Sequence, residues 1–188
     1  RRGARKQIKI HAPQVDINSL LEDDPQYQSS DESSSALQAS LPLSLSFGVA
    51  SDPNPRHRSS MEDRHVHRLH LGGIRESAFF AIYDGHGGDR AANFLQKHFH
   101  RQFAKQLKLI PTDPVKALET TYLAVDAAMG GHSDFHECGS TAVTAFIQSQ
   151  EGNKQLVIAN AGDAAAVLAV EGSNIKSPMS PSQRSSLS

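Results

Sequence analysis

A continuous apolar run at residues 78–83, AFFAIY, constrains the fold of this chain more than any other feature. Its length is that of a β-strand, and the Asp84-Gly85 dipeptide that follows it is a common turn signal. We therefore predict a buried strand that ends in a carboxylate. An acid in this position is held rigidly by the strand and is still exposed at the edge of the sheet.

Two helices are predicted after this strand. The first spans residues 88–107, where apolar side chains recur every three or four positions on one face: Ala92, Leu95, Phe99, Phe103 and Leu107. Asp113 suits the N-cap of the second helix, and Pro114 suits its first position, where the missing N–H costs nothing. The apolar stripe of this second helix is Val115, Leu118, Tyr122, Val125 and Met129. The Gly130-Gly131 pair is then predicted to end it.

Further short strands are predicted at residues 45–50, 141–148, 155–160 and 165–170. Gly152-Asn153 suits a turn between the second and third of these strands. Gly162-Asp163 suits a turn between the last two. Two strands, two consecutive helices and then a meander indicate a segregated α+β fold rather than alternating βαβ units.

Composition divides the chain into three parts. Residues 1–43 form a Ser-rich segment that we expect to be a flexible arm, residues 44–172 carry the periodic patterns, and residues 173–188 form a Ser/Pro-rich tail. The hydrophobic fraction of 38% is low for a chain that folds throughout. Since the sequence begins at Arg1 rather than Met, we expect the chain to be cut from something longer.

Charge and cysteine usage limit the partners and the compartment. The 19 basic and 20 acidic residues nearly balance, which gives no electrostatic argument for binding nucleic acid or an anionic membrane. No apolar run has the length needed to span a bilayer. The single cysteine, Cys138, allows no intrachain disulfide, so we expect an intracellular protein of the cytoplasm or the nucleus.

Three short segments place acids at strand ends or in tight turns. They are RSSMED at 58–63, DGHGG at 84–88 and NAGD at 160–163. Carboxylates and backbone carbonyls are the ligands that Mg²⁺ and Mn²⁺ prefer, and a glycine lets a carbonyl approach an ion closely. Taken singly, each segment is explained better as a structural feature, namely a turn, a hairpin or a solvated acidic pair.

The order of the segments resembles the PP2C (PPM) family of metal-dependent serine/threonine protein phosphatases. RSSMED at 58–63 is similar to the first motif of that family and DGHGG at 84–88 to its central one. GSTA at 139–142 and ANAGD at 159–163 are similar to two later motifs. The resemblance implies a β-sandwich flanked by helices, of which this chain would hold the N-terminal half and lack the C-terminal half.

The resemblance also implies a site and a reaction. In the family, two Mn²⁺ or Mg²⁺ ions share an activated water that attacks the phosphate of a phosphoserine or phosphothreonine in a protein. Asp84 would be the bridging metal ligand, Gly85 would coordinate through its carbonyl, and Asp63 would act mainly through water. The remaining roles fall to Glu62 as support for the metal shell, Asp163 at a weaker third metal position, Arg58 as the phosphate-binding group and His86 as the general acid.

The sequence departs from the family pattern in two places. Ala164-Ala165 stands where the family usually has Ser-Arg, and no acid follows Glu171, although two further aspartates complete the metal shell of the family. A truncated, non-catalytic module that binds phosphoproteins or kinases therefore stays open as an alternative.

The stretch from Phe47 to Asp63 looks like that of fungal members, some of which act on stress-activated MAP kinases, so a MAP kinase is one candidate substrate.

Overall fold

The computed structural model describes residues 45–150 and 152–169. The predicted arm at 1–43 and tail at 173–188 lie outside the described residues. Along the chain the elements are β1 (Arg64–Leu69), η2 (Leu71–Gly73), β2 (Ser77–Tyr83), β3 (Gly85–His86), α2 (Arg90–Leu109), α3 (Pro114–Gly130), η3 (Ser133–Phe135), β4 (Gly139–Ser140), β5 (Ala142–Gln150) and β6 (Asn153–Ala161).

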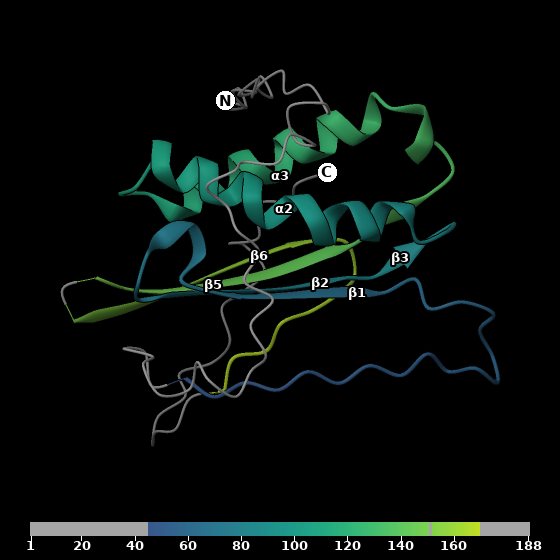
Figure 1. The fold of residues 1–188 in the computed structure, drawn as a ribbon, viewed down its shortest axis with the longest axis horizontal. Coiled ribbons are helices and arrows are strands. Elements are labelled where there is room, and N and C mark those ends of the chain that lie inside the picture. The colour runs from purple at the N-terminus through teal and green to yellow at the C-terminus, as the bar shows by residue number, and fades with distance from the viewer. Residues whose placement is uncertain (1–44, 151, 170–188) are drawn as a thin grey trace, which may run out of the picture.

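One antiparallel sheet with the strand order β1-β2-β5-β6 forms the body of the fold, and both long helices lie on the same face of it (Figure 1). The predicted apolar run became β2, one of the two central strands. Its side chains alternate, so that Phe79, Ala81 and Tyr83 are buried, whereas Ile82 faces away from the helices and is 53% exposed. The α+β class predicted from the sequence is confirmed.

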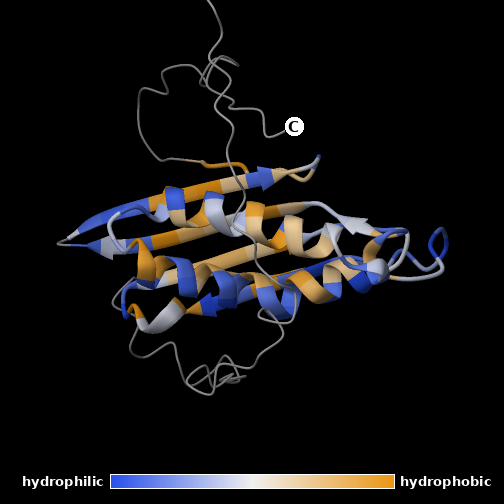
Figure 2. Ribbon diagram, turned by 90° about the horizontal axis from the view of Figure 1, so that it is seen from above, coloured by the Kyte–Doolittle hydropathy of each residue, from blue (hydrophilic) through white to orange (hydrophobic). Residues whose placement is uncertain are grey.

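Both helices form close to where the sequence predicted them. The Asp113 carboxylate accepts a hydrogen bond from the Lys116 amide at 2.9 Å, and Pro114 occupies the first turn of α3. The prediction that Val115 belongs to the buried stripe of α3 is wrong. Val115 is 56% exposed, because it lies in the first turn, outside the face of α3 that packs against α2 and the sheet. Figure 2 shows both polar and apolar residues around the helices and longer apolar stretches along the strands.

Aromatic side chains fill the space between the sheet and α2. The ring of Phe103 lies 5.7 Å from that of Phe79 and 5.1 Å from that of Phe146, which pair across β2 and β5. Phe99 extends the cluster toward Tyr83 and Tyr122, at 6.1 Å and 4.9 Å between ring centroids. Aromatic burial of this kind dominates the energy of a small core and fixes α2 on the sheet.

Two predicted strands are absent from the described residues. Residues 45–50 and 165–169, the described part of the predicted strand at 165–170, are not hydrogen-bonded as strands, and no strand of the described part of the chain pairs with them. The ring of Phe47 packs against Phe80 and His67 on the sheet face opposite the helices. A sandwich needs a second sheet on that face, whereas the described residues supply one four-stranded sheet and the short β3-β4 pair.

Neither α2 nor α3 combines the length and the hydropathy of a membrane span, and the same holds for every helix in residues 45–150 and 152–169.

Stability is predicted to depend on the protonation of His100, which is buried in α2. Burial, and then the positive charges of Arg68 and Arg101, lower the pKa of its imidazole from 6.5 to about 3. Between these values the unfolded chain binds more protons than the folded one, so stability falls as the pH drops below 6.5. His100 alone should cost about 1.4 kcal/mol of unfolding free energy per pH unit there.

Urea unfolding of His100→Gln between pH 7.5 and 5 measures this dependence. We expect a flatter pH profile than in the parent chain, whereas His65→Gln, at an exposed position on β1, should keep the parent profile. Equal profiles for the parent chain and His100→Gln would contradict this assignment.

Candidate functional site

The antiparallel register brings four chain segments to one edge of the sheet. Arg64 at the start of β1 is opposite Tyr83 at the end of β2, and Ala142 at the start of β5 is opposite Ala161 at the end of β6. Asp63 precedes β1, and Asp84 follows β2. Residues far apart in sequence, from the motifs at 58–63, 84–88, 139–142 and 159–163, are therefore neighbours along this edge.

The backbone of Asp84 is tied to the start of β5. Its carbonyl accepts hydrogen bonds from the Thr141 amide at 2.9 Å and from the Ser140 hydroxyl at 3.2 Å. Its amide donates to the Thr141 hydroxyl at 3.2 Å. These bonds leave the Asp84 carboxylate free to face solvent at the sheet edge, as the sequence predicted for an acid directly after a buried strand.

The carboxyl groups of Asp63 and Asp84 approach each other there. Partial loss of contact with water raises the pKa of the Asp63 carboxyl most, although the residue as a whole is exposed. The charge of Asp84, within hydrogen-bonding reach, raises this pKa further, while Arg58 and Arg64 lower it. Two carboxylates that repel each other at an exposed edge form a donor set that suits a hard divalent cation. Asp63 and Asp84 therefore supply two carboxylates of the kind that Mg²⁺ and Mn²⁺ prefer, which fits part of a metal site.

Glycines allow the first two motifs to touch. A Cβ on Gly85 would lie 2.6 Å from the Glu62 carbonyl oxygen, and one on Gly87 would lie 2.2 Å from the Glu137 carbonyl oxygen. Gly87 also has a φ of +70°, which side chains other than glycine rarely adopt. The DGHGG loop therefore needs glycine for close backbone approach to its neighbours, in addition to any role in a turn.

The side chain of Glu62 is directed to the DGHGG loop. Its Oε2 accepts a hydrogen bond from the Gly88 amide at 3.3 Å, and its Oε1 accepts one from the Ser60 hydroxyl at 3.1 Å. Glu62 thus connects the two motifs through the backbone, separately from the Asp63 and Asp84 pair.

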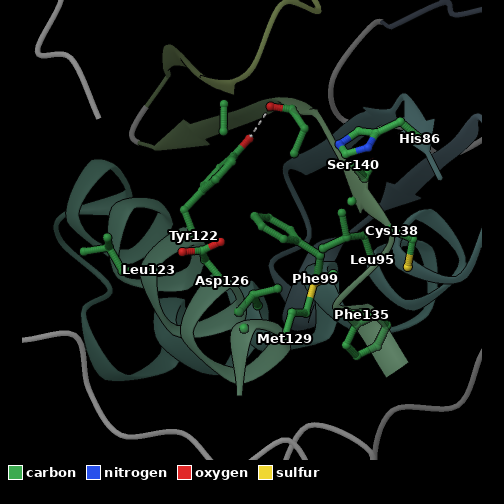
Figure 3. A pocket seen from close by; sticks show the side chains of 15 residues that line it. His86, Leu95, Phe99, Tyr122, Leu123, Asp126, Met129, Phe135, Cys138 and Ser140 are labelled. Carbon is green, nitrogen blue, oxygen red and sulfur yellow. Dashed lines mark hydrogen bonds between the residues drawn. The ribbon is translucent and has the colours of Figure 1, made fainter. Parts of the chain in front are cut away.

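His86 lies on the wall of a cavity of about 680 Å³ between α2, α3 and β4 (Figure 3). It pairs with Gly139 in the two-stranded β3-β4 sheet, and its ring covers that glycine so closely that a Cβ there would lie 2.6 Å from Nε2. The other walls are mostly apolar, including Leu95, Phe99 and Met129. His86 is exposed and can reach solvent at the mouth of the site.

Arg58 and Asp163 are both exposed to solvent, at the two ends of the set of motifs. Arg58 is exposed and lies near enough to Asp63 to lower the pKa of that carboxyl. Asp163 is exposed and follows Gly162, whose φ of +99° turns the chain away from β6. Within residues 45–150 and 152–169, no three His, Cys, Asp or Glu side chains gather closely enough to hold a metal ion. The structure therefore brings Asp63 and Asp84 together, and Asp163 does not join them in such a group.

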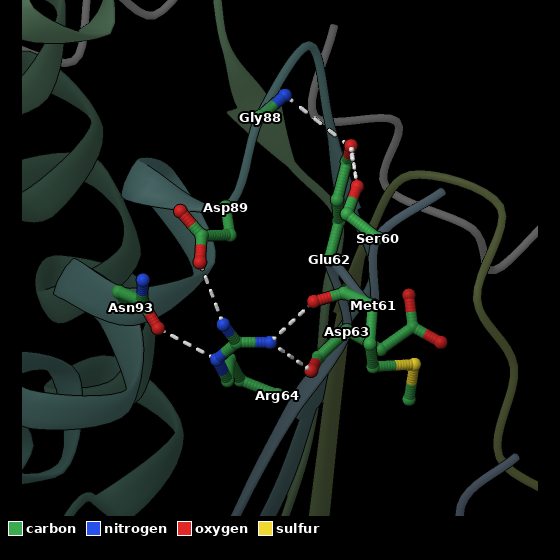
Figure 4. A network of polar contacts seen from close by, with 8 residues as sticks. All are labelled: Ser60, Met61, Glu62, Asp63, Arg64, Gly88, Asp89 and Asn93. Atoms are coloured by element: carbon green, nitrogen blue, oxygen red, sulfur yellow. Dashed lines mark hydrogen bonds and ion pairs between the residues drawn. The ribbon is translucent and has the colours of Figure 1, made fainter. Parts of the chain in front are cut away.

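Arg64 is the prominent residue of this site that sequence analysis missed. Its guanidinium bonds to Asp89 and Asn93 at the start of α2 and to the carbonyls of Met61 and Asp63 (Figure 4). An arginine at the start of a strand gives no signal by itself. Its partners at 89 and 93 are separated from it by the whole of β1 and β2, so only the fold identifies them.

Comparisons with known proteins agree with this geometry. The family model described as protein phosphatase 2C matches residues 47–186. The chain belongs to the protein phosphatase 2C family. It is 36% identical over 134 residues to protein phosphatase 2C homolog 1 of Schizosaccharomyces pombe, covering 69% of this chain and 38% of that protein. It is 39% identical over 117 residues to probable protein phosphatase 2C 25 of Arabidopsis thaliana, covering 61% of this chain and 28% of that protein.

The third comparison is with protein phosphatase 2C homolog 2 of Aspergillus fumigatus, at 36% identity over 129 residues, covering 61% of this chain and 29% of that protein. The chain thus spans between 28% and 38% of the length of these three relatives. Both this chain and its described fold correspond to part of a protein phosphatase 2C domain.

Replacing Gly85 by alanine tests the close contact between the first two motifs. We expect Gly85→Ala to lower the unfolding free energy by roughly 1–3 kcal/mol, because its Cβ would collide with the Glu62 carbonyl. The matched control is Gly130→Ala at the end of α3, where nothing lies within 4 Å of the added Cβ. That change should be neutral or stabilise by up to about 1 kcal/mol. Equal unfolding midpoints for the two variants in urea would contradict the close approach.

Proposed function

We propose that this chain forms part of an enzyme that hydrolyses phosphoserine and phosphothreonine in proteins with two Mn²⁺ or Mg²⁺ ions, and a third bound more weakly. The observation that supports this most is the juxtaposition of the Asp63 and Asp84 carboxyls at one sheet edge, each inside a motif of the family. The match to protein phosphatase 2C supports the same reaction class.

The residues at this edge divide into metal-holding and supporting groups. Asp84 would be shared between the ions, Gly85 would offer its carbonyl, Asp63 would act through water, and Asp163 would serve the third position. Glu62 would hold the DGHGG loop through the Gly88 amide. Bound ions of this kind lower the pKa of a water molecule and neutralise charge that develops on a phosphoryl group.

Two further residues would handle the substrate. Arg58 is exposed beside Asp63, and its planar guanidinium suits two oxygens of a phosphate. His86 would give its proton to the serine or threonine oxygen as the bond between that oxygen and phosphorus breaks, which leaves the substrate hydroxyl neutral. The exposure of His86 at the cavity mouth supports access to such a leaving group. A stress-activated MAP kinase is one candidate substrate, by the resemblance of residues 47–63 to fungal members of the family.

The alternative is a module that binds phosphoproteins or kinases without turnover. Ala164-Ala165, which supplies neither a hydroxyl nor a cation next to Asp163, favours this alternative. Both functions use the same edge of the sheet, and they differ in whether the bound phosphate is released.

Hydrolysis of a phosphothreonine peptide by the 188-residue chain, with and without Mn²⁺, separates these functions. If this chain by itself catalyses the reaction, turnover should require Mn²⁺ and fall at least about 100-fold in Asp84→Asn, because the shared ligand is lost. Asp134→Asn, an exposed acid in η3, is the control and should match the parent. Turnover that is absent, or indifferent to Asp84→Asn, from a folded chain would contradict catalysis by this chain. Peptide binding without turnover would support the module.

A further inference from the structure

We propose that Arg64 is a positioning residue for the metal site, which holds the backbone of residues 61–63 against the start of α2 and so fixes Asp63 beside Asp84. This inference rests on the proposed function, since it names the residue that sets the metal affinity of the same site. Neither the motifs nor the family match assigns a role to Arg64.

The guanidinium of Arg64 bridges two elements (Figure 4). Its Nη1 donates to the carbonyls of Met61 and Asp63, each at 2.8 Å. Its Nε donates to the Asn93 side-chain oxygen at 2.6 Å, and its Nη2 to Asp89 Oδ2 at 2.8 Å. Four hydrogen bonds therefore use four of the five N–H groups that an arginine carries.

These bonds hold a segment that the sheet does not hold. β1 begins at Arg64, and residues 61–63 pair with no strand in the described part of the chain. Backbone carbonyls that have no hydrogen-bond partner in a sheet form hydrogen bonds with other groups. The carbonyls of Met61 and Asp63 accept theirs from the Arg64 guanidinium. The bonds to Met61 and Asp63 thus restrain the backbone from which the Asp63 side chain projects, and α2 serves as the rigid support.

Geometry matters more than charge in this arrangement. The Arg64 side chain is 22% exposed and that of Asp89 is 47% exposed, and ion pairs in contact with solvent contribute little to stability. Lysine would keep the charge but has a single nitrogen that cannot reach carbonyls and side chains on two sides of a planar fork. Because Arg64 is already engaged on both sides, it acts through Asp63, whereas the exposed Arg58 remains available for phosphate.

The test is Mn²⁺ binding by the full chain, measured from the free Mn²⁺ signal in electron paramagnetic resonance. We expect Arg64→Met and Arg64→Lys each to weaken Mn²⁺ affinity by about 10-fold or more, as is typical when groups that orient metal ligands are removed. Arg68→Met is the matched control, since Arg68 is also on β1 and its guanidinium donates to the neighbouring His67 carbonyl rather than to residues 61–63. It should bind Mn²⁺ as the parent chain does.

All variants are compared at a temperature where circular dichroism shows each one folded, so lower stability alone does not change the affinity. If Arg64→Met does not fold, Arg64→Lys, which keeps the aliphatic stem and the charge, decides the question. Parent-like affinity in Arg64→Lys overturns the positioning role, because the positive charge of residue 64 would then be enough for Mn²⁺ binding. Parent-like affinity in both Arg64 variants overturns the inference but not the proposed function. Failure of the parent chain itself to bind Mn²⁺ overturns both.

Discussion

The antiparallel pairing of β2 with β1 and β5 is the constraint on which the site depends. It aligns the start of β1, the end of β2 and the start of β5 at one edge, so that Asp63 and Asp84 meet although 20 residues of strand and turn separate them. A shift of one residue in either register would turn Tyr83 out of the core and move the Asp84 backbone away from Thr141. The aromatic cluster under β2 therefore protects the site as well as the fold.

The edge holds like charges together against their repulsion. Partial loss of contact with water raises the pKa of the Asp63 carboxyl most, the nearby Asp84 raises it further, and the positive charges of Arg58 and Arg64 offset part of this increase. The backbone carries much of the remaining constraint, through the bonds between Asp84 and Thr141 and through the contact of Gly85 with Glu62. Under the proposed function, these contacts would arrange the edge before a cation arrives and so lower the reorganisation needed on binding.

Local patterns predicted most of the fold, and long-range contacts decided the rest. The apolar run at 78–83, the stripe of α2 and the Asp113 cap each carry their own signal, and each element formed. The predicted strands at 45–50 and 165–170 have strand-like composition, but a strand also needs a hydrogen-bonding neighbour, which the described residues do not provide. The same division between local patterns and long-range contacts applies to the site. The acids were predicted from their motifs, whereas Arg64 was missed because its partners Asp89 and Asn93 are identified only by the fold.

The central claim is that this sheet edge binds a divalent metal, and paramagnetic broadening by Mn²⁺ in amide nuclear magnetic resonance spectra tests it most directly. The strands β5 and β6 are nine residues long, so their far end lies about 30 Å from the edge. At low Mn²⁺ the amide signals of Asp63, Asp84 and Gly85 should broaden first, while those of Gln150 and Asn153 stay sharp. Broadening centred elsewhere, for example around η3 (Ser133–Phe135), or spread evenly over the chain would contradict the account.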